Sequence, residues 1–209
     1  MYLPQHFVET DMSEISSLVA DFPLAALVVN TAEGLVANHL PLMEDGNSAL
    51  IGHIALDNDL HRQVSDGHEV LAIFRGEDAY VSPNWYATKP LHHRHVPTWN
   101  YQVVHVHGKI SFQRDHKARL AAVGRLTKLH EAKIGEADPW KMSDAPKEYL
   151  LEMLDRIVAF RIDVTRVVAK SKLSQNREER DYLGAIKGLH AAGQGELARR
   201  MEQRLRKDR

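Results

Sequence analysis

Hydrophobic and polar residues alternate with a period of two along much of the first half of the chain. This alternation is typical of strands with one buried face, and clusters of turn residues such as Glu33-Gly34 and Asp45 to Ser48 separate the runs. Several short strands with turns between them favour an antiparallel barrel or sandwich. The predicted strands cover residues 24–30, 35–42, 49–54, 69–75, 78–81 and 102–113.

The period changes to that of a helix in the second half of the chain. Leu120, Val123, Leu126 and Leu129 form one apolar stripe, and the segment 157–168 then returns to strand alternation. The pattern predicts an α+β fold, mainly β, in which a barrel core carries peripheral helices and a C-terminal helix pair. The first predicted helix begins at Asp11 or Ser13 and ends at Phe22-Pro23. Further helices are predicted over 61–65, 115–133, 146–156, 179–190 and 196–206.

Composition indicates a soluble protein with a sizeable core. The chain has 209 residues, of which 44% are hydrophobic and 26% charged, which suits one large domain or a domain with an appendage. Neither a signal peptide nor an apolar run of membrane-spanning length is recognisable. The absence of cysteine excludes disulfides and thiolate metal sites, so we expect a cytoplasmic location.

Charge is unevenly distributed, although the net charge is only −1. From Arg166 onward twelve Lys and Arg face six Asp and Glu, so this tail carries about +6 and the remainder about −7. A basic tail is suited to nucleic acid or an anionic ligand, and it is equally the composition of a solvated helix surface. Both interpretations remain open at this point.

Aromatic and amide side chains are concentrated in two neighbouring runs, Ser82 to Tyr86 and Val96 to Tyr101. Rings that stack and amides that bond to polar edges suit a flat heteroaromatic ligand. The alternative is a packed strand corner in which each ring has found its own hydrogen-bond partner.

A second polar run, Lys170 to Arg177, follows a predicted strand. Its two ammonium groups, guanidinium, hydroxyls and amides are donors that suit a phosphate or another anion, and Lys89 could add charge near the aromatic run. The alternative is a strand-to-helix connection with Ser174 or Asn176 as the helix N-cap.

Other constellations give weaker indications. His105 and His107 share one face of a predicted strand, which could begin a metal site, but no carboxylate stands at a ligand-like offset, so we predict no metal. Phosphate-binding loops, dinucleotide fingerprints and serine-nucleophile motifs are not recognisable in the sequence.

Many short motifs together resemble the PaiB family of FMN-binding proteins, which are often labelled negative transcriptional regulators. The resemblance runs from Met1 to about Leu189. It is carried by Met1-Tyr2-x-Pro4-x-x-Phe7, Asn38 to Leu42, Gly52 to Ala55, Ala79 to Tyr86, Val96 to Tyr101, Val104 to Gly108, Leu126-Thr127-x-x-His130-Glu131, Asp138-Pro139-Trp140 and Lys172 to Asn176.

The resemblance implies a split β-barrel of the pyridoxamine-phosphate-oxidase type, in homodimers with FMN at the subunit interface. It implies a barrel domain over 1–176 and a basic helical extension over 177–209 that packs on it. Ligands from 172–176 would come from the partner subunit. The implied cofactor-binding residues are His53, Ile54, Asn58, Lys89, Thr98, Trp99, Asn100, Lys172, Ser174, Gln175 and Asn176.

One loop departs from the family pattern. After His53-Ile54-Ala55 the family usually has Arg and then Asn-Pro, whereas this chain reads Leu56-Asp57-Asn58-Asp59. Loss of a charge-assisted hydrogen bond costs about 1.5–3 kcal/mol, so we expect FMN affinity lower by roughly ten- to a hundredfold if this loop meets the phosphate.

The resemblance leaves several functions open. A flavin-linked redox or sensing role, a flavin reductase or other flavin-dependent oxidoreductase, and a haem-binding or haem-degrading protein all fit a split barrel. A DNA-binding regulator would use the C-terminal helices, where Arg199, Arg200, Arg204 and Arg206 lie on one predicted helix. The sequence names no substrate.

Overall fold

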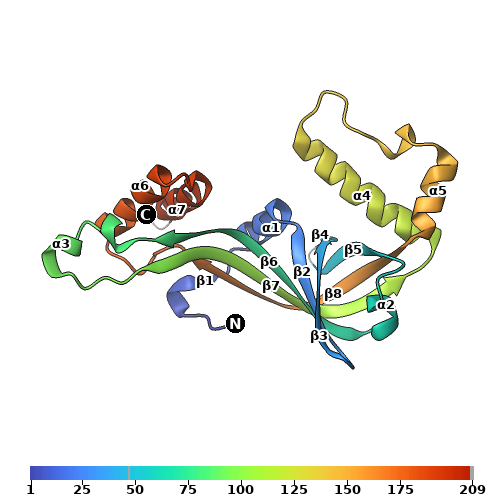
Figure 1. Cartoon of the computed structure of the whole chain (residues 1–209), viewed down its shortest axis with the longest axis horizontal. Coiled ribbons are helices and arrows are strands. Elements are labelled where there is room, and N and C mark those ends of the chain that lie inside the picture. Colours follow the sequence, from blue (N-terminus) through green and yellow to red (C-terminus); the bar gives the residue numbers. More distant parts are fainter. Residues whose placement is uncertain (47, 208–209) are drawn as a thin grey trace. The chain divides into compact units, whose positions relative to one another are not determined.

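A computed structural model describes residues 1–46 and 48–207. Asn47 in the second predicted turn, and Asp208 and Arg209 of the basic tail, lie outside the described residues. The centre of the fold is an antiparallel sheet with the strand order β3-β2-β6-β7-β8-β5-β4, and β1 pairs with β8 (Figure 1). The strands are β1 (Val8–Glu9), β2 (Leu24–Thr31), β3 (Gly34–Pro41), β4 (Met43–Glu44), β5 (Ala49–Ala55), β6 (His68–Val81), β7 (Thr98–Gln113) and β8 (Ile157–Lys172).

Helices connect and flank these strands. The α-helices are α1 (Met12–Asp21), α2 (Leu60–Gln63), α3 (Lys89–His92), α4 (His116–Ile134), α5 (Lys147–Asp155), α6 (Glu179–Ala191) and α7 (Gly195–Lys207). Three short 3-10 helices complete the list: η1 (Gln5–Phe7), η2 (Pro83–Trp85) and η3 (Met142–Asp144). Within the described residues, none of the helices is both long enough and apolar enough to span a membrane.

The chain forms two compact units, each built from several chain segments. Unit 1 comprises Met1–Leu18, Arg75–Val104 and Val168–Arg209, and unit 2 comprises Val19–Phe74 and His105–Val167. The long strands β6, β7 and β8 therefore contribute residues to both units. The domain boundary expected at residue 176 stays a prediction.

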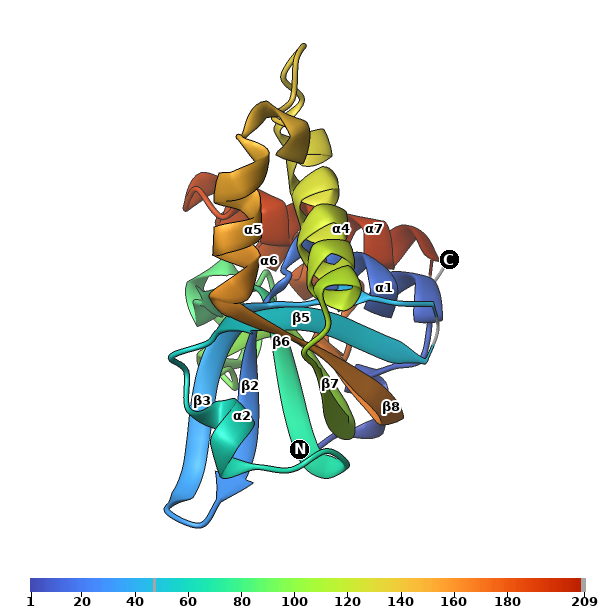
Figure 2. The same ribbon diagram turned by 90° about the vertical axis from the view of Figure 1, so that its right-hand side faces the viewer.

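The core of unit 2 is formed by the inward faces of β2, β5 and β8. Ala25, Leu27 and Val29 alternate on β2 and are almost fully buried, as the period of two requires. On β5, Gly52 lies opposite Phe160 of β8, and a Cβ atom there would be 2.8 Å from that ring. Helix α4 lies against β5, as Figure 2 shows.

The core of unit 1 lies beneath the C-terminal helix pair, α6 and α7 (Figure 1). Two glycines of α6 allow a close approach to Trp85 in η2. A Cβ atom on Gly184 would be 2.1 Å from the Trp85 carbonyl oxygen, and one on Gly188 would be 2.2 Å from its indole ring. The buried residues of this core are Ala79, Val81, Tyr86, Leu173, Tyr182, Ala185, Ile186, Leu189, Leu197, Ala198 and Met201.

The longer elements agree with the sequence pattern except at the strands that reach unit 1, and the short elements β1, β4 and α3 were not predicted. The two strands predicted over 69–75 and 78–81 are wrong, because β6 is continuous from His68 to Val81. Strand β7 begins at Thr98, four residues earlier than predicted, and β8 continues to Lys172. The alternative interpretation of the run 170–177 placed the helix N-cap at Ser174 or Asn176, but Glu178 occupies the N-cap position of α6.

Candidate functional site

Three cationic side chains gather in unit 1, where β8 ends and the connection to α6 begins. Lys170 Nζ lies 5.3 Å from the centre of the Tyr101 ring, and Lys172 Nζ lies 5.9 Å from the same ring. The Arg177 guanidinium lies 4.9 Å from the centre of the Tyr86 ring. We call Lys170, Lys172 and Arg177 the cationic cluster.

In the part of the chain that the structure describes, the cationic cluster has no carboxylate partner. Within residues 1–46 and 48–207, the hydrogen bonds of these three side chains go to a hydroxyl, backbone carbonyls and a histidine ring. Lys170 is only 7% exposed, although a buried lysine is normally paired. Burial lowers the pKa of Lys172, and the charges of Lys170 and Arg177 lower this pKa further. An anion bound here would relieve this repulsion.

Buried amide–hydroxyl pairs hold the strands and loop that carry the cluster. Asn100 of β7 donates to the Ser174 hydroxyl (2.9 Å), and Gln102 donates to the Ser171 hydroxyl (3.0 Å). Ser174 has φ +69°, a left-handed conformation that a non-glycine residue rarely adopts. Gln175 bonds back to its own loop, accepting from Leu173 N at 2.7 Å. These contacts fix the loop between Lys172 and Arg177.

A buried hydrogen-bond chain ties the same region to α6. The Thr88 hydroxyl donates to Asp181 Oδ2 (2.6 Å) and lies 2.7 Å from His95 Nε2. Burial raises the pKa of the Asp181 carboxyl, but the hydrogen bonds from Thr88 outweigh it and the net pKa is lowered. His95 Nδ1 lies 3.3 Å from Arg177 Nη1, so this chain orients the guanidinium of the cationic cluster.

Aromatic side chains beside the cluster differ in exposure. Trp99 is 53% exposed and Tyr80 is 48% exposed, and their rings meet edge-to-face with centroids 6.2 Å apart. The Tyr86 side chain is buried, and its hydroxyl lacks a hydrogen-bond partner among the described residues. Burial raises the pKa of this phenol. The exposed pair offers ring faces to a planar ligand.

The predicted site residues of unit 2 lie on β5 and the turn after it. His53 is partly buried, and its Nδ1 atom lacks a hydrogen-bond partner in the described part of the chain. Burial lowers the pKa of this imidazole. Ile54 is buried in the core, and Asn58 donates to Asn38 Oδ1 at 2.8 Å.

A guanidinium reaches the loop that departs from the family pattern. Arg62 of α2 bonds to Asp59 Oδ1 (2.6 Å) and to the Leu56 carbonyl (3.2 Å). The negative charge of Asp59 is therefore balanced within the loop. Arg62 comes from the next helix, so the loop sequence alone did not predict this contact.

Some of the predicted cofactor-binding residues of unit 1 lie together in the structure, and others do not contact them. Lys172 Nζ contacts both the Thr98 hydroxyl and the Trp99 carbonyl oxygen. Asn100, Ser174 and Gln175 are engaged with their own unit, as described above. Lys89 contacts Asn84, while the side chain of Asn176 is exposed.

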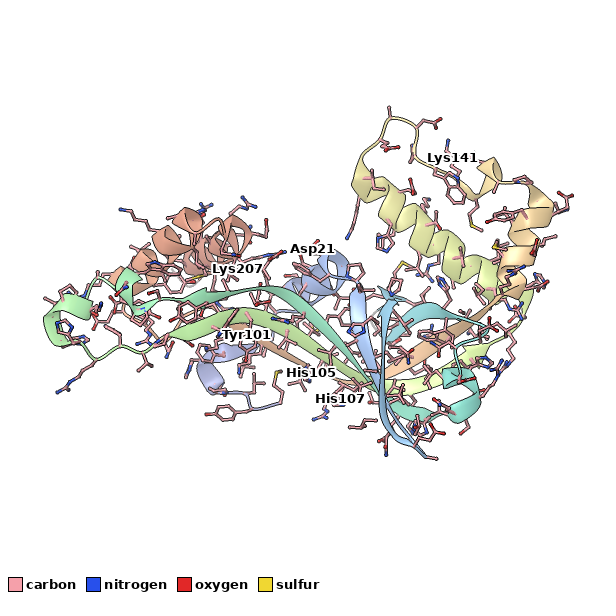
Figure 3. The ribbon with its side chains drawn as sticks, viewed as in Figure 1. Asp21, Tyr101, His105, His107, Lys141 and Lys207 are labelled. Atoms are coloured by element: carbon pink, nitrogen blue, oxygen red, sulfur yellow. The ribbon has the colours of Figure 1, made fainter. Side chains whose placement is uncertain are left out.

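The histidine pair of β7 does not form part of a metal cluster. His105 and His107 project from one face of the strand (Figure 3), and Arg166 Nη2 lies 3.1 Å from His107 Nε2. Burial lowers the pKa of both imidazoles. Among the residues that the structure describes, groups of three or more His, Cys, Asp or Glu with metal-binding geometry do not occur.

The basic residues of α7 pair with carboxylates of the same chain. Arg204 bonds to Glu9 (2.9 Å), whose side chain is 8% exposed, and Lys207 lies 3.2 Å from Asp11 and contacts Glu14. Arg199 and Arg200 both face Glu196 of their own helix. Much of the positive charge of the tail is thus balanced by the N-terminal segment and by α7 itself.

Sequence reasoning missed several members of this arrangement. The sequence indicates Lys170 and Arg177 only as parts of a polar run, and it does not single out Asp181. The available signal was the high density of cations in 170–177, a run that contains no carboxylate. The partnership of Thr88 with Asp181 spans 93 positions, so only the fold reveals it.

Comparisons with known proteins agree on the class. A family model described as "Putative FMN-binding domain" matches residues 1–166. The Bacillus subtilis protein named "Protease synthase and sporulation protein PAI 2" is 34% identical over 215 residues, covering 99% of both chains. An uncharacterised protein of Emericella nidulans is 30% identical over 230 residues, covering 92% of both chains.

Solved structures show the same fold at low sequence identity. A flavocytochrome from Azotobacter vinelandii has a TM-score of 0.59 at 10% identity, covering 87% of this chain and 78% of its own. An FAD- and haem-binding protein from Mycobacterium smegmatis has a TM-score of 0.58 at 13% identity, covering 85% and 78%. The fold is thus a flavoprotein split β-barrel, as the resemblance implied.

The chain belongs to the PaiB family of FMN-binding proteins, and FMN is its cofactor. The family model ends at residue 166, before the cationic cluster, while the similarity to the Bacillus subtilis protein extends over almost the full chain.

Proposed function

We propose that the cationic cluster binds the phosphate of FMN and that the bound flavin serves a redox role. The observation that carries the proposal is the gathering of Lys170, Lys172 and Arg177 without an ion-pair partner in the described residues. A phosphate is doubly charged near neutral pH, and ammonium and guanidinium groups are its usual ligands. The charge of the phosphate would offset both the repulsion among the three cations and the free-energy cost of burying Lys170.

The surroundings of the cluster suit the rest of the cofactor. Lys172 lies next to Thr98 and Trp99, so the exposed Trp99 ring is available to the flavin ring system. When bound, the flavin supplies electron and hydride transfer, while the protein binds and orients it. The internal bonds of Asn100, Ser174 and Gln175 give these three residues a positioning role.

The protein in this proposal is a homodimer. The exposed Tyr80–Trp99 pair supports it, because two large aromatic side chains half open to solvent are unusual unless a partner or ligand covers them. A second subunit would also supply further residues around the flavin, as the resemblance to the family implies.

The arrangement favours a redox role over direct DNA binding. DNA recognition requires basic side chains that are available to phosphates and others that reach base edges. Four basic residues of α7, at 199, 200, 204 and 207, already face carboxylates of this chain. This pairing is why we do not assign DNA binding to the C-terminal helices.

The location of the phosphate is tested by comparing FMN with riboflavin, which lacks the phosphate. Both are titrated against the purified protein, with quenching of flavin fluorescence as the signal. We expect FMN to bind at least about tenfold more tightly, because the phosphate adds charge-assisted hydrogen bonds. Equal affinities would overturn the assignment of a phosphate site.

The redox role has a separate test. The FMN-saturated protein is mixed with NADH or NADPH, and oxidation of the nicotinamide is followed against free FMN at the same concentration. Acceleration over free FMN supports the redox role. A rate equal to that of free FMN, with both nicotinamides, would overturn a reductase function while leaving the FMN site intact.

A further inference from the structure

A groove in unit 2 lies between α4 and the segment that follows it. Its volume is about 540 Å³, and its lining is predominantly apolar. Two sequence motifs meet there: Thr127 and Glu131 come from the first, and Pro139 and Trp140 from the second. Figure 3 shows Lys141 on this second segment, which turns back toward α4. A concave apolar surface of this size suits a small organic ligand.

Two features fix the shape of the groove. The Glu131 carboxylate accepts a hydrogen bond from the backbone N–H of Trp140 (3.1 Å), which holds the indole-bearing segment over the helix. Gly124 lines the groove as well, and a Cβ atom there would lie 3.4 Å from the Met142 sulfur. The absence of a side chain at Gly124 therefore keeps space open in the groove. The neighbouring atoms would leave room for a Cβ atom, so close packing does not require a glycine at this position.

The charges along the groove favour an anion. Lys128 and Lys141 contribute two ammonium groups to the lining, against the one carboxylate of Glu131. The Glu131 carboxylate already accepts the Trp140 N–H, and Lys141 has only a long contact of 3.4 Å with Asp138, on an exposed surface. Such an exposed pair is weak and leaves the ammonium available to a ligand.

We propose that this groove is a binding site for a planar aromatic carboxylate. The ring would lie against Trp140, Pro139 and Met142, and the carboxylate would face Lys128 and Lys141. The inference rests on groups of unit 2 alone and does not depend on the position of FMN.

A series of three isosteric probes tests the charge preference. The probes are 1-naphthoate, neutral 1-naphthalenemethanol and cationic 1-naphthylmethylammonium, titrated by calorimetry into the FMN-saturated protein. We expect affinity to fall in that order. Equal affinity for all three, or absence of 1-naphthoate binding at millimolar concentration, would overturn the proposal.

Matched variants locate the binding. Gly124→Leu fills the groove and is expected to weaken 1-naphthoate binding at least about tenfold, since the added side chain takes the space that the ligand would occupy. Ala121→Leu, at an exposed position of the same helix, is the control. The double variant Lys128→Gln/Lys141→Gln should weaken 1-naphthoate about fivefold and leave the alcohol unchanged. Lys117→Gln, also exposed on α4, controls for net charge.

FMN is itself a planar aromatic anion, so a competition experiment separates the two ligands. We expect 1-naphthoate affinity in the flavin-free protein to equal that in the FMN-saturated protein. Displacement of 1-naphthoate by stoichiometric FMN would make the groove the flavin site and overturn the inference. Retained binding in Gly124→Leu would also overturn it, and the folding of that variant is checked by circular dichroism.

Discussion

Two buried amide side chains, Asn100 and Gln102, determine how β7 meets β8 in unit 1. Each occupies an inward position where an apolar residue would be usual, and each donates to a serine hydroxyl on the 171–174 segment. A buried polar group without a partner costs about 1–3 kcal/mol, so these pairs also select the register that satisfies them. The side chains of Lys170 and Lys172 are placed by that register.

Gly184 and Gly124 are both in helix interiors but differ in their surroundings. Gly184→Ala should destabilise the protein by about 1–3 kcal/mol, since the new methyl group would meet the backbone of η2. Gly124→Ala, which meets only a sulfur at 3.4 Å, should stabilise it by about 0.5–1 kcal/mol through helix propensity. Urea unfolding measures both, and equal effects at the two sites would contradict the close packing of α6 on Trp85.

The partly buried imidazole of His53 makes stability depend on pH. Burial lowers its folded pKa below the ordinary value of 6.5, so the unfolded chain binds the proton more readily. The contribution of the neutral His53 imidazole to the free energy of unfolding is therefore complete above about pH 6.5. It is lost as the pH falls from there toward the folded pKa. We expect the free energy of unfolding to decrease between pH 7.5 and 5.5, and to decrease less in His53→Gln.

The control for this pH dependence is His93→Asn, since His93 is exposed and asparagine tolerates its positive φ. This variant should keep the wild-type slope. An unchanged slope in His53→Gln would show that the imidazole of His53 is already hydrated in the folded protein.

At the scale of elements, strand alternation located most of the sheet but failed where polar residues face inward. Val103 to Ile110 carry a recognisable apolar pattern, whereas Asn100 interrupts it and delays the predicted start of β7 to Gln102. The strand pattern is also interrupted at Gly76 and Glu77, although β6 continues through these residues. Local pattern cannot predict a buried amide whose partner lies some 70 positions away.

The candidate site was predictable in composition and not in geometry. The polar run 170–177 indicated an anion ligand from its residue types, and the resemblance supplied FMN. That Asn100 and Ser174 bond to each other depends on the pairing of distant strands, so the sequence could not distinguish ligand-binding residues from those that position the loop. The contact of Arg62 with Asp59 could not be predicted from the loop sequence, because Arg62 lies outside the loop, on α2.

Helix α7 should depend on one partly buried ion pair far more than on its exposed ones. Arg204→Gln leaves the Glu9 carboxylate, which is 8% exposed, without its charged partner, and should destabilise the protein by about 1–3 kcal/mol. Arg199→Gln on the same helix breaks an exposed pair and should change stability by less than about 0.5 kcal/mol. Urea unfolding compares the two, and similar losses would contradict the docking of α7 through Glu9.

At the scale of the whole molecule, the exposed aromatic pair predicts the oligomeric state. Wild-type protein should sediment as a dimer, and Trp99→Lys should shift it toward monomer because a charge would then have to be buried in the interface. Leu91→Lys, another exposed apolar position of unit 1, is the control and should leave the dimer intact. A monomeric wild-type protein, or a dimer unaffected by Trp99→Lys, would contradict this interface.

The proposed site of the FMN phosphate is thus a single cluster of cations. Lys172 is the member that lies beside both Thr98 and the exposed Trp99, so its ammonium is central to the proposed phosphate site. Arg62 of α2, which contacts the loop after β5, is the competing cation. A third cation, Lys187, is exposed on α6 and serves as a control for net charge.

The most direct test is the dissociation constant of FMN and of riboflavin for wild type, Lys172→Gln, Arg62→Gln and Lys187→Gln. Loss of one charge-assisted contact costs about 1.5–3 kcal/mol, so Lys172→Gln should weaken FMN roughly ten- to a hundredfold. It should leave riboflavin unchanged, and the other two variants should bind both ligands as wild type does. A phosphate-specific loss in Arg62→Gln, with Lys172→Gln unaffected, would contradict the proposed site.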